Sequence, residues 1–171
     1  MILILSILVI LILFFGLIEF KIHQKSLSKI PIRIHVNGSR GKSSVVRLIA
    51  AGLRSGGVKT VAKTTGTSPR IIDEFGHDKY IHRLRSASIG EQISLIRRFS
   101  KIKPDALVIE CMAVNPQYQW ISEHKIVRST IGVMTNVRPD HLDEMGISIN
   151  QITKSMANTI PFNGTLVTAE D

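Results

Sequence analysis

The residues best suited to chemistry lie in one short stretch, at positions 37–44. Glycines at positions 38 and 41 let the backbone turn sharply and approach an anion closely. Lys42 can contact terminal phosphates as a point charge, and the Ser43 hydroxyl can bind Mg²⁺. The pattern G-x-x-G-K-S is typical of a phosphate-binding loop. The candidate binding residues are Asn37, Gly38, Ser39, Arg40, Gly41, Lys42, Ser43 and Ser44.

The elements on either side of this loop have the order that phosphate binding requires. Residues 32–36 are rich in β-branched side chains and predict a strand, and residues 45–53 predict a helix. The N–H groups at the beginning of that helix would point at the anion. One position departs from the full P-loop pattern, because Val36 stands where that pattern has its first glycine. The alternative interpretation is a surface glycine turn that carries a basic residue.

Two later strands end in polar residues that could bind a metal ion. Residues 106–109 form an apolar run typical of a strand buried on both faces, and Glu110 follows it. Residues 130–135 form a second run, after which come Asp140 and His141. Because carboxyl ends of parallel strands meet at one sheet edge, we expect Glu110 beside the glycine loop, where it could hold Mg²⁺ or Mn²⁺. Glu110 could instead cap a nearby N–H, and spacing alone leaves the role of His141 open.

The rest of the chain alternates between strands and helices. Strands are predicted over 58–62 and 165–168, and helices over 88–102, 115–123 and 149–159. The loop 63–70 could be a simple turn, and the stretch 71–84 a hairpin or a mobile flap. This alternation predicts an α/β fold, with a parallel sheet flanked by helices. The histidines other than His141 are expected to be surface or partly packed residues: His23, His35, His77, His82 and His124.

The amino-terminal segment is almost wholly apolar. Residues 1–18 would span about 27 Å as a helix, which is close to the shortest length that crosses a bilayer. We predict a transmembrane anchor over 1–19, a basic juxtamembrane linker over 20–31, and a P-loop domain over 32–171. The cations that follow the apolar run place the amino terminus outside and the domain in the cytoplasm. A cleaved signal peptide is the alternative, but the segment has no basic residue before the apolar run.

The charge distribution restricts the expected partners. From Glu19 to Lys103 there are 18 Lys and Arg against 5 Asp and Glu, whereas from Pro104 onward there are 4 against 8. The basic part favours an anionic lipid surface or an acidic polymer. Nucleic acid is not expected as a partner, because the chain has 9 aromatic residues and no basic–aromatic stripe. The single cysteine, Cys111, excludes an internal disulfide and fits a reducing compartment.

Taken together, three stretches resemble the ATP-dependent Mur ligase superfamily, which includes folylpolyglutamate synthase. They are residues 37–43, the strand that ends at Glu110, and residues 136–143. Residues 63–67, 89–92 and 110–116, together with the apolar amino terminus, resemble more narrowly the membrane-associated ligase subunit of poly-γ-glutamate synthases. The resemblance covers essentially the whole chain.

This resemblance implies a carboxylate–amine ligase of a bacterial cell membrane. ATP would phosphorylate the terminal carboxylate of a poly-γ-glutamate chain, and the amine of an incoming glutamate would attack the acyl phosphate. Lys42 and the loop backbone would hold the ATP phosphates, Ser43 a first Mg²⁺, and Glu110 with His141 a second. The substrate carboxylate or the γ-phosphate would be faced by Thr64, Thr65, Gly66 and Thr67. Other membrane subunits of a synthase complex are the implied partners.

The resemblance leaves some expectations and alternatives. Mur-type ligases are longer, so we expect 1–171 to be an amino-terminal portion that binds ATP–Mg²⁺ weakly and does not ligate alone. A GTPase would be expected to carry an Asn-Lys-x-Asp motif, which the sequence lacks. A folylpolyglutamate-synthase-like ligase is a nearer alternative, although a soluble folate enzyme needs no anchor. The third alternative is a non-catalytic membrane scaffold with a degenerate P-loop domain.

Overall fold

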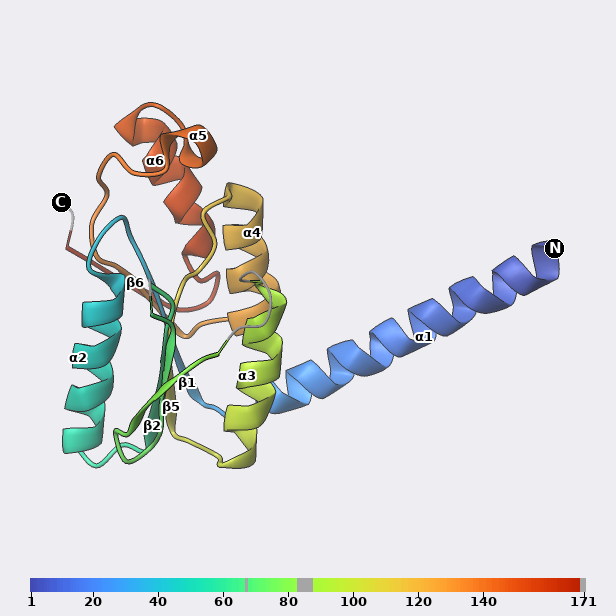
Figure 1. The fold of residues 1–171 in the computed structure, drawn as a ribbon, viewed down its shortest axis with the longest axis horizontal. Coiled ribbons are helices and arrows are strands. Elements are labelled where there is room, and N and C mark those ends of the chain that lie inside the picture. The colour runs from blue at the N-terminus through green and yellow to red at the C-terminus, as the bar shows by residue number, and fades with distance from the viewer. Residues whose placement is uncertain (67, 83–87, 170–171) are drawn as a thin grey trace.

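The computed structural model describes residues 1–66, 68–82 and 88–169, which form a sheet covered by helices and one projecting helix (Figure 1). Within these residues the sheet has seven strands in the order β4-β3-β2-β5-β1-β6-β7. The strands are β1 Ile32–Asn37, β2 Thr60–Thr64, β3 Arg70–Ile72, β4 Asp78–Tyr80, β5 Ala106–Glu110, β6 Ile131–Met134 and β7 Thr165–Thr168. The helices are α1 Ile2–Leu27, α2 Lys42–Ser55, α3 Gly90–Lys101, α4 Pro116–Ile121, the π-helix η1 Ser122–Val127, α5 Leu142–Met145, α6 Ile149–Met156 and the 3₁₀-helix η2 Ala157–Thr159.

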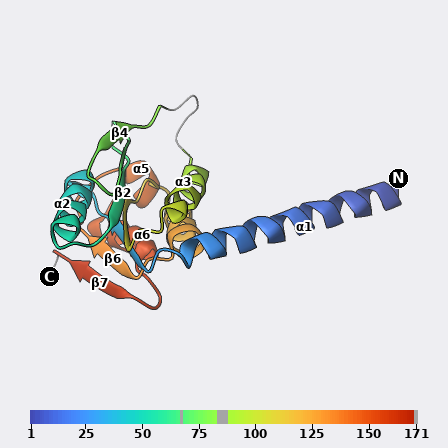
Figure 2. The same cartoon turned by 90° about the horizontal axis from the view of Figure 1, so that it is seen from below.

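The sheet is mixed, which corrects the prediction of a wholly parallel one. β2, β5, β1, β6 and β7 run parallel to one another, but β3 pairs antiparallel with β2 and β4 antiparallel with β3. The connection from β2 to β3 is too short for a helical crossover, so the chain reverses direction. The turn between β3 and β4 is closed by Asp73, whose Oδ1 accepts from the N–H groups of Phe75 and His77. Of the two alternatives for 71–84, the hairpin is therefore the one observed (Figure 2).

Two apolar layers hold the helices to the sheet. Alternate residues of β5 point to opposite faces, as the pleat requires. Val108 joins Val36 of β1 and Val46 of α2 in one buried cluster. Leu107 and Ile109 join a second cluster with residues of α3 on the other face. The continuous apolar run 106–109 is thus buried on both faces, as predicted.

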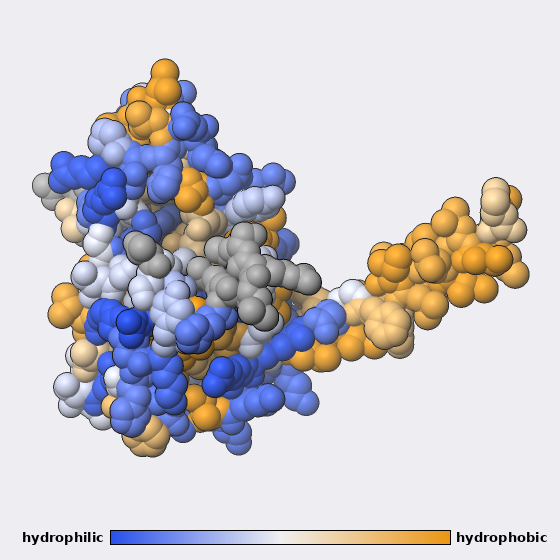
Figure 3. All heavy atoms as spheres, in the orientation of Figure 1, coloured by the Kyte–Doolittle hydropathy of each residue, from blue (hydrophilic) through white to orange (hydrophobic). Residues whose placement is uncertain are grey.

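Helix α1 projects from the domain and is apolar along most of its length (Figures 1 and 3). By length and composition it could cross a membrane, and its most apolar stretch is not covered by the described parts of the chain. It continues to Leu27, so most of the segment expected as a linker is helical. Its last turns pack on the domain, with His23, Ser26 and Leu27 buried and Glu19 paired with Arg97 of α3. This helix is consistent with membrane association, and the anchor, linker and domain boundaries stay predictions.

Candidate nucleotide-binding site

The glycine loop joins β1 to α2 and has the backbone that its sequence predicts. Gly38 has φ 137° and Gly41 φ 79°, and Gly41 directly precedes the first residue of α2. Both values lie in the region that glycine adopts most readily. Within the described residues no side chain caps the amino terminus of α2. The N–H groups of its first turn are therefore not satisfied by a capping side chain, and the positive end of the helix dipole lies at the loop.

A second loop, residues 135–141 after β6, holds the glycine loop in place and is called the bracing loop below. The Asn136 carbonyl accepts from Ser39 N at 2.9 Å, and its side-chain oxygen accepts from Arg40 N at 3.0 Å. The Arg40 carbonyl in turn accepts from Thr135 Oγ1 at 2.8 Å and from Asn136 Nδ2 at 2.9 Å. Gly38 fits closely against this loop, because a Cβ there would lie 2.1 Å from Thr135 Oγ1. The two loops therefore form one hydrogen-bonded unit.

Glu110 brings together the ends of three elements. It is 3% exposed, at the end of β5 and in register with Val36 of β1. Its Oε2 accepts from Ser43 Oγ at 2.7 Å and from Thr65 N at 2.6 Å, while its carbonyl accepts from Thr65 Oγ1 at 3.3 Å. The predicted position beside the glycine loop is thus what the structure shows. The alternative that Glu110 caps a nearby N–H also describes part of what it does.

The Lys42 ammonium group contacts carbonyl groups of the glycine loop itself. Lys42 Nζ donates to Gly38 O at 2.6 Å and to Ser39 O at 3.3 Å. Arg40 lies at the outer rim, where its exposed guanidinium group is 3.2 Å from Asp140 Oδ1. Ser44, the last of the predicted binding residues, is exposed in the first turn of α2. The loop thus carries two cations, of which Arg40 is paired with a carboxylate and Lys42 is held by backbone carbonyls.

Asn37 supports the loop from behind. The residue is 2% exposed, and its Nδ2 donates to Gln119 Oε1 at 3.1 Å and to Thr159 Oγ1 at 3.0 Å. Its Oδ1 accepts from Gly38 N at 2.8 Å. These bonds occupy the polar atoms of the side chain, so Asn37 orients Gly38 instead of presenting its own amide to a ligand.

The predicted substrate loop is shorter than expected. β2 extends to Thr64, so that Lys63 and Thr64 are buried strand residues, and Lys63 Nζ lies 3.1 Å from Glu91 Oε1. Gly66 is exposed and faces Ser43, since a Cβ on it would lie 3.3 Å from Ser43 Oγ. Thr65 contacts Glu110 as described above, and Thr67 lies outside the described residues. The accessible part of this loop therefore begins at Thr65.

His141 lies at the far end of the bracing loop. It has φ 47°, precedes α5, and its Nε2 is 4.0 Å from Asp140 Oδ1 with half of its side chain exposed. Across the described ranges 1–66, 68–82 and 88–169, no hydrogen bond or ion pair joins His141 to Glu110, and no group of three His, Cys, Asp or Glu side chains is arranged to hold a metal. Their shared metal role stays a prediction.

A buried ion pair lies beneath the loop and was not anticipated. His35 Nδ1 of β1 is 2.7 Å from Glu123 Oε2 of η1, and both side chains are fully buried. Burial alone would lower the pKa of His35, but the neighbouring Cys111 thiol and Glu123 carboxylate raise it to about 9. Burial opposes the ionised form of Glu123, but His35 and Ser129 lower its pKa. The expectation that His35 is a surface or partly packed residue is wrong, and the same holds for His23, which is also buried.

Comparison with known proteins matches residues 36–170 to the Mur ligase middle domain. The chain belongs to the Mur ligase family. It is 41% identical over 172 residues to the capsule biosynthesis protein CapB of Bacillus anthracis, covering 99% of the chain and 37% of that protein. It is 43% identical over 158 residues to the PGA synthase CapB of Bacillus subtilis strain 168, covering 91% and 40%. The chain thus spans about two fifths of the length of these relatives.

A solved complex of FPGS with AMPPCP and folate has the same fold, with a TM-score of 0.63 and 20% identity over 89% of this chain and 42% of that one. The predicted family is therefore confirmed, and so is the predicted α/β class of a Mur ligase middle domain, with the mixed sheet as the correction.

The candidate site contains supporting residues that the sequence alone did not indicate. Asn136 follows a strand end, which is a usable signal, but its three bonds to the glycine loop depend on which strands are neighbours. Gln119 and Thr159 lie 82 and 122 residues from Asn37 along the chain. No short-range pattern marks pairs at such separations.

The residues at this site suit a Mg²⁺ ion. Ser43 Oγ and Glu110 Oε2 are adjacent oxygen donors at the open end of the glycine loop, 2.7 Å apart. Mg²⁺ binds oxygen ligands and commonly takes one or two protein groups together with phosphate oxygens and water. In this Mur ligase the hydroxyl and the carboxylate would be those protein groups.

Proposed function

We propose that this Mur ligase family member is an ATP-dependent amide ligase that extends poly-γ-glutamate. The observation that carries the proposal is the contact of Glu110 with both Ser43 and Thr65 beside a glycine loop. It joins a phosphate-binding loop, a metal-binding carboxylate and a polar loop at one sheet edge, as transfer of a phosphoryl group to a carboxylate requires. The two CapB relatives, one described as a PGA synthase and one as a capsule biosynthesis protein, support the choice of substrate.

In the proposed reaction the glycine loop binds ATP. The N–H groups of the loop and of the first turn of α2 would donate to the β- and γ-phosphate oxygens. Lys42 Nζ would leave its hydrogen bonds to the carbonyls of Gly38 and Ser39 and bind the terminal phosphate. There its positive charge would offset the negative charge that develops during phosphoryl transfer. The terminal carboxylate of the glutamate chain then displaces ADP from the γ-phosphorus and becomes an acyl phosphate. The amine of the incoming glutamate displaces phosphate and forms the γ-amide.

Mg²⁺ in this site would neutralise phosphate charge and hold the transferred group in line. Ser43 and Glu110 are the proposed ligands of this ion. Glu110 and His141 together are the proposed ligands of a second ion. Mn²⁺ would suit the same donors. Thr65 N–H orients the Glu110 carboxylate, and the residues that we propose to face the substrate are Thr64, Thr65, Gly66 and Thr67, of which Thr64 acts through its backbone because its side chain is buried.

We also propose a location and partners for the protein. Helix α1 would be a single transmembrane anchor with the amino terminus outside and the domain in the cytoplasm, next to other membrane subunits of a synthase. The excess of cations between residues 19 and 103 would attract the polyanionic product. Neutralising cations of that region should then lower polymer affinity and reduce its salt dependence.

The experiment measures polymer formation from ATP and glutamate in native membranes that carry the protein. Lys42→Ala and Glu110→Gln should each lose most of the activity, whereas Lys154→Ala, an exposed lysine of α6, should retain it. Hydroxylamine added to the wild type should trap the acyl phosphate as a hydroxamate and release phosphate without polymer. Unchanged polymer in both site variants would contradict the ligase and leave the alternative of a non-catalytic membrane scaffold. Hydroxamate from folates but not from γ-glutamyl chains would favour a folylpolyglutamate-synthase-like ligase.

A further inference from the structure

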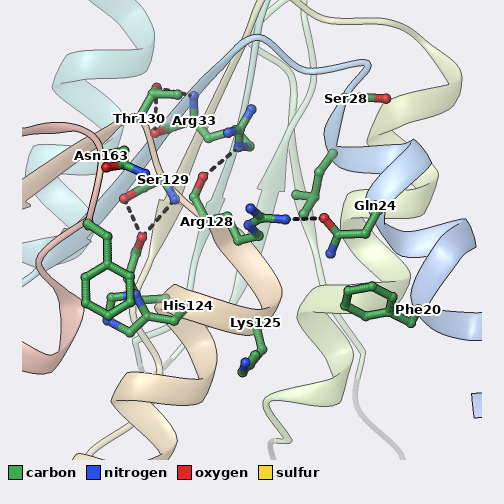
Figure 4. A pocket seen from close by; sticks show the side chains of 13 residues that line it. Phe20, Gln24, Ser28, Arg33, His124, Lys125, Arg128, Ser129, Thr130 and Asn163 are labelled. Carbon is green, nitrogen blue, oxygen red and sulfur yellow. Dashed lines mark hydrogen bonds between the residues drawn. The ribbon is translucent and has the colours of Figure 1, made fainter. Parts of the chain in front are cut away.

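A cavity lies at the foot of α1, at the end of the sheet opposite the glycine loop. It encloses about 580 Å³, and one wall comes from α1 through Phe20 and Gln24. The other wall comes from the start of β1, through Arg33, and from the end of η1 and the residues that follow, including Arg128 (Figure 4). Arg33 precedes Asn37 by four residues of β1, about 13 Å at the rise of a strand. This cavity is therefore separate from the proposed nucleotide site.

The cavity carries an excess of positive charge. Arg33, Lys125 and Arg128 line it, and among the described residues none of the three forms an ion pair. The Arg33 guanidinium group donates to Arg128 O at 2.9 Å and to Ile30 O at 2.6 Å, while Arg128 donates to Gln24 Oε1. Both arginines are thus held in place by neutral oxygens and keep their full charge.

The acidic and imidazole groups at the cavity do not cancel this charge. Glu123 also lines the cavity, but its carboxylate is engaged by His35 and Ser129, and the raised pKa of His35 keeps that pair neutral overall at pH 7. Burial lowers the pKa of His124, so its ring is uncharged at pH 7. Burial and the charge of Arg128 lower the pKa of Arg33, and the Glu123 carboxylate offsets only part of that decrease. A bound anion would further stabilise the charged form of Arg33. Guanidinium groups remain protonated in proteins.

The depth of the cavity along α1 suggests which anion it binds. The apolar run of α1 ends at Ile18, so Phe20 and Gln24 lie about 3 Å and 9 Å beyond it along the helix. The polar headgroup layer of one leaflet is roughly 5–8 Å thick. If α1 crosses the membrane as proposed, the cavity mouth lies among phospholipid headgroups. Phe20 would lie at the boundary between acyl chains and headgroups, where aromatic side chains are favoured.

We propose that this cavity binds the phosphate headgroup of an anionic phospholipid and thereby fixes the domain to the foot of its membrane helix. The forks of Arg33 and Arg128 suit phosphate oxygens, which Arg often binds through two parallel hydrogen bonds. Basic pockets beside transmembrane helices are known sites for acidic lipid headgroups. The proposal rests on the membrane position of α1 but requires neither ATP nor glutamate, so it can fail without affecting the proposed ligase.

The protein contains its own reporter for this site. Trp120 is the single tryptophan. Its ring lies 5.2 Å from that of His124, a cavity residue, and 5.1 Å from Lys125 Nζ. An anion that draws Lys125 toward the cavity would change the environment of Trp120 and therefore its fluorescence.

The experiment titrates the whole chain, in a neutral detergent, with a short-chain phosphatidylglycerol below its micelle concentration. Trp120 emission should change saturably, with an affinity at least tenfold higher than for the phosphatidylcholine of equal chain length. Arg128→Gln should weaken binding at least tenfold, whereas Lys154→Gln, the same loss of charge on α6, should change it less than twofold. If Arg128→Gln does not fold by circular dichroism, Arg128→Lys replaces it and should weaken binding several-fold.

Four results would overturn the proposal. The first is equal affinity for the two lipids, and the second is unchanged affinity in a folded Arg128 variant. The third is inorganic phosphate binding as tightly as the lipid, which would assign the cavity to free phosphate. The fourth is displacement of the lipid by a γ-glutamyl oligomer at a lower concentration than the lipid itself, which would assign the cavity to the polymer.

Discussion

Replacing Gly38 by alanine tests whether the glycine loop and the bracing loop form one unit. The change introduces backbone strain and a steric clash. Its φ of 137° is a conformation that an alanine adopts at a cost of about 1–3 kcal/mol. The added Cβ would also lie 2.1 Å from Thr135 Oγ1 and 3.0 Å from Asn136 N, so backbone or side chain must move, at a further cost of about 1–3 kcal/mol. We expect Gly38→Ala to lose roughly 2–6 kcal/mol of unfolding free energy.

Two other glycines of the same region provide matched controls. Gly41 has φ 79° but no atom within 4 Å of an added Cβ, so Gly41→Ala should cost only the backbone strain, about 1–2 kcal/mol. Gly52 lies in α2, with no positive φ and no neighbour, so Gly52→Ala should stabilise the protein by about 1 kcal/mol. From the most to the least stable, the expected order is therefore Gly52→Ala, wild type, Gly41→Ala and Gly38→Ala.

Urea unfolding followed by the fluorescence of Trp120 measures these differences, and calorimetric titration with AMPPCP measures binding. Gly38→Ala should also lose AMPPCP binding, because Asn136 and Thr135 can no longer hold Ser39 and Arg40. A Gly38→Ala protein as stable as Gly41→Ala, with unchanged binding, would refute the close fit of the two loops.

Three further predictions concern the site and the buried pair beneath it. The folded-state pKa of His35 is about 9 against an ordinary 6.5, so its contribution to the free energy of unfolding is complete below pH 6.5 and is lost as the pH rises through 9. Over that range the wild type should lose roughly 3 kcal/mol of stability and Glu123→Gln much less, as measured by urea unfolding at several pH values. Ser43→Ala should reduce the increase in AMPPCP affinity that Mg²⁺ causes at least tenfold. Ser44→Ala, which removes an exposed hydroxyl, should reduce that increase less than threefold, and equal effects of the two variants would remove Ser43 from the metal site. Asn37→Ala should destabilise the protein by about 2–4 kcal/mol, because it leaves Gln119 and Gly38 N without their buried partner, and a loss under 0.5 kcal/mol in urea unfolding would contradict that role.

The sequence carries the information for the glycine loop because its physics is local. Gly38 and Gly41 permit the turn, and the strand before them and the helix after them follow from patterns within a dozen residues. The place of Glu110 was also predictable, since an apolar strand that ends in a carboxylate must end at the same sheet edge as β1 if both are parallel.

What the sequence does not reveal is which side chains meet across the fold. His35 and Glu123 are 88 residues apart, and neither lies in a pattern that marks a buried charge. The direction of β3 depends on the length of the connection after β2. The sequence left residues 71–84 open between a hairpin and a flap, and it predicted the end of β2 at residue 62, because Lys63 and Thr64 look like loop residues although they extend the strand. Polar residues in a strand are compatible with burial when a partner such as Glu91 satisfies them.

The segment formed by α4 and η1 connects the two proposed anion sites, which lie at opposite ends of β1. Gln119 of α4 holds Asn37 and, through it, Gly38 at the nucleotide edge. Glu123 of η1 holds His35 in the middle of β1 and Ser129 beside the basic cavity at the other edge. Because these contacts are buried and short, the segment fixes the middle of β1 and its carboxyl end relative to the residues that follow η1. If α1 crosses the membrane as proposed, a domain fixed in this way at its foot would keep the glycine loop at a constant distance from the membrane, which suits the proposed extension of a polymer beside membrane subunits.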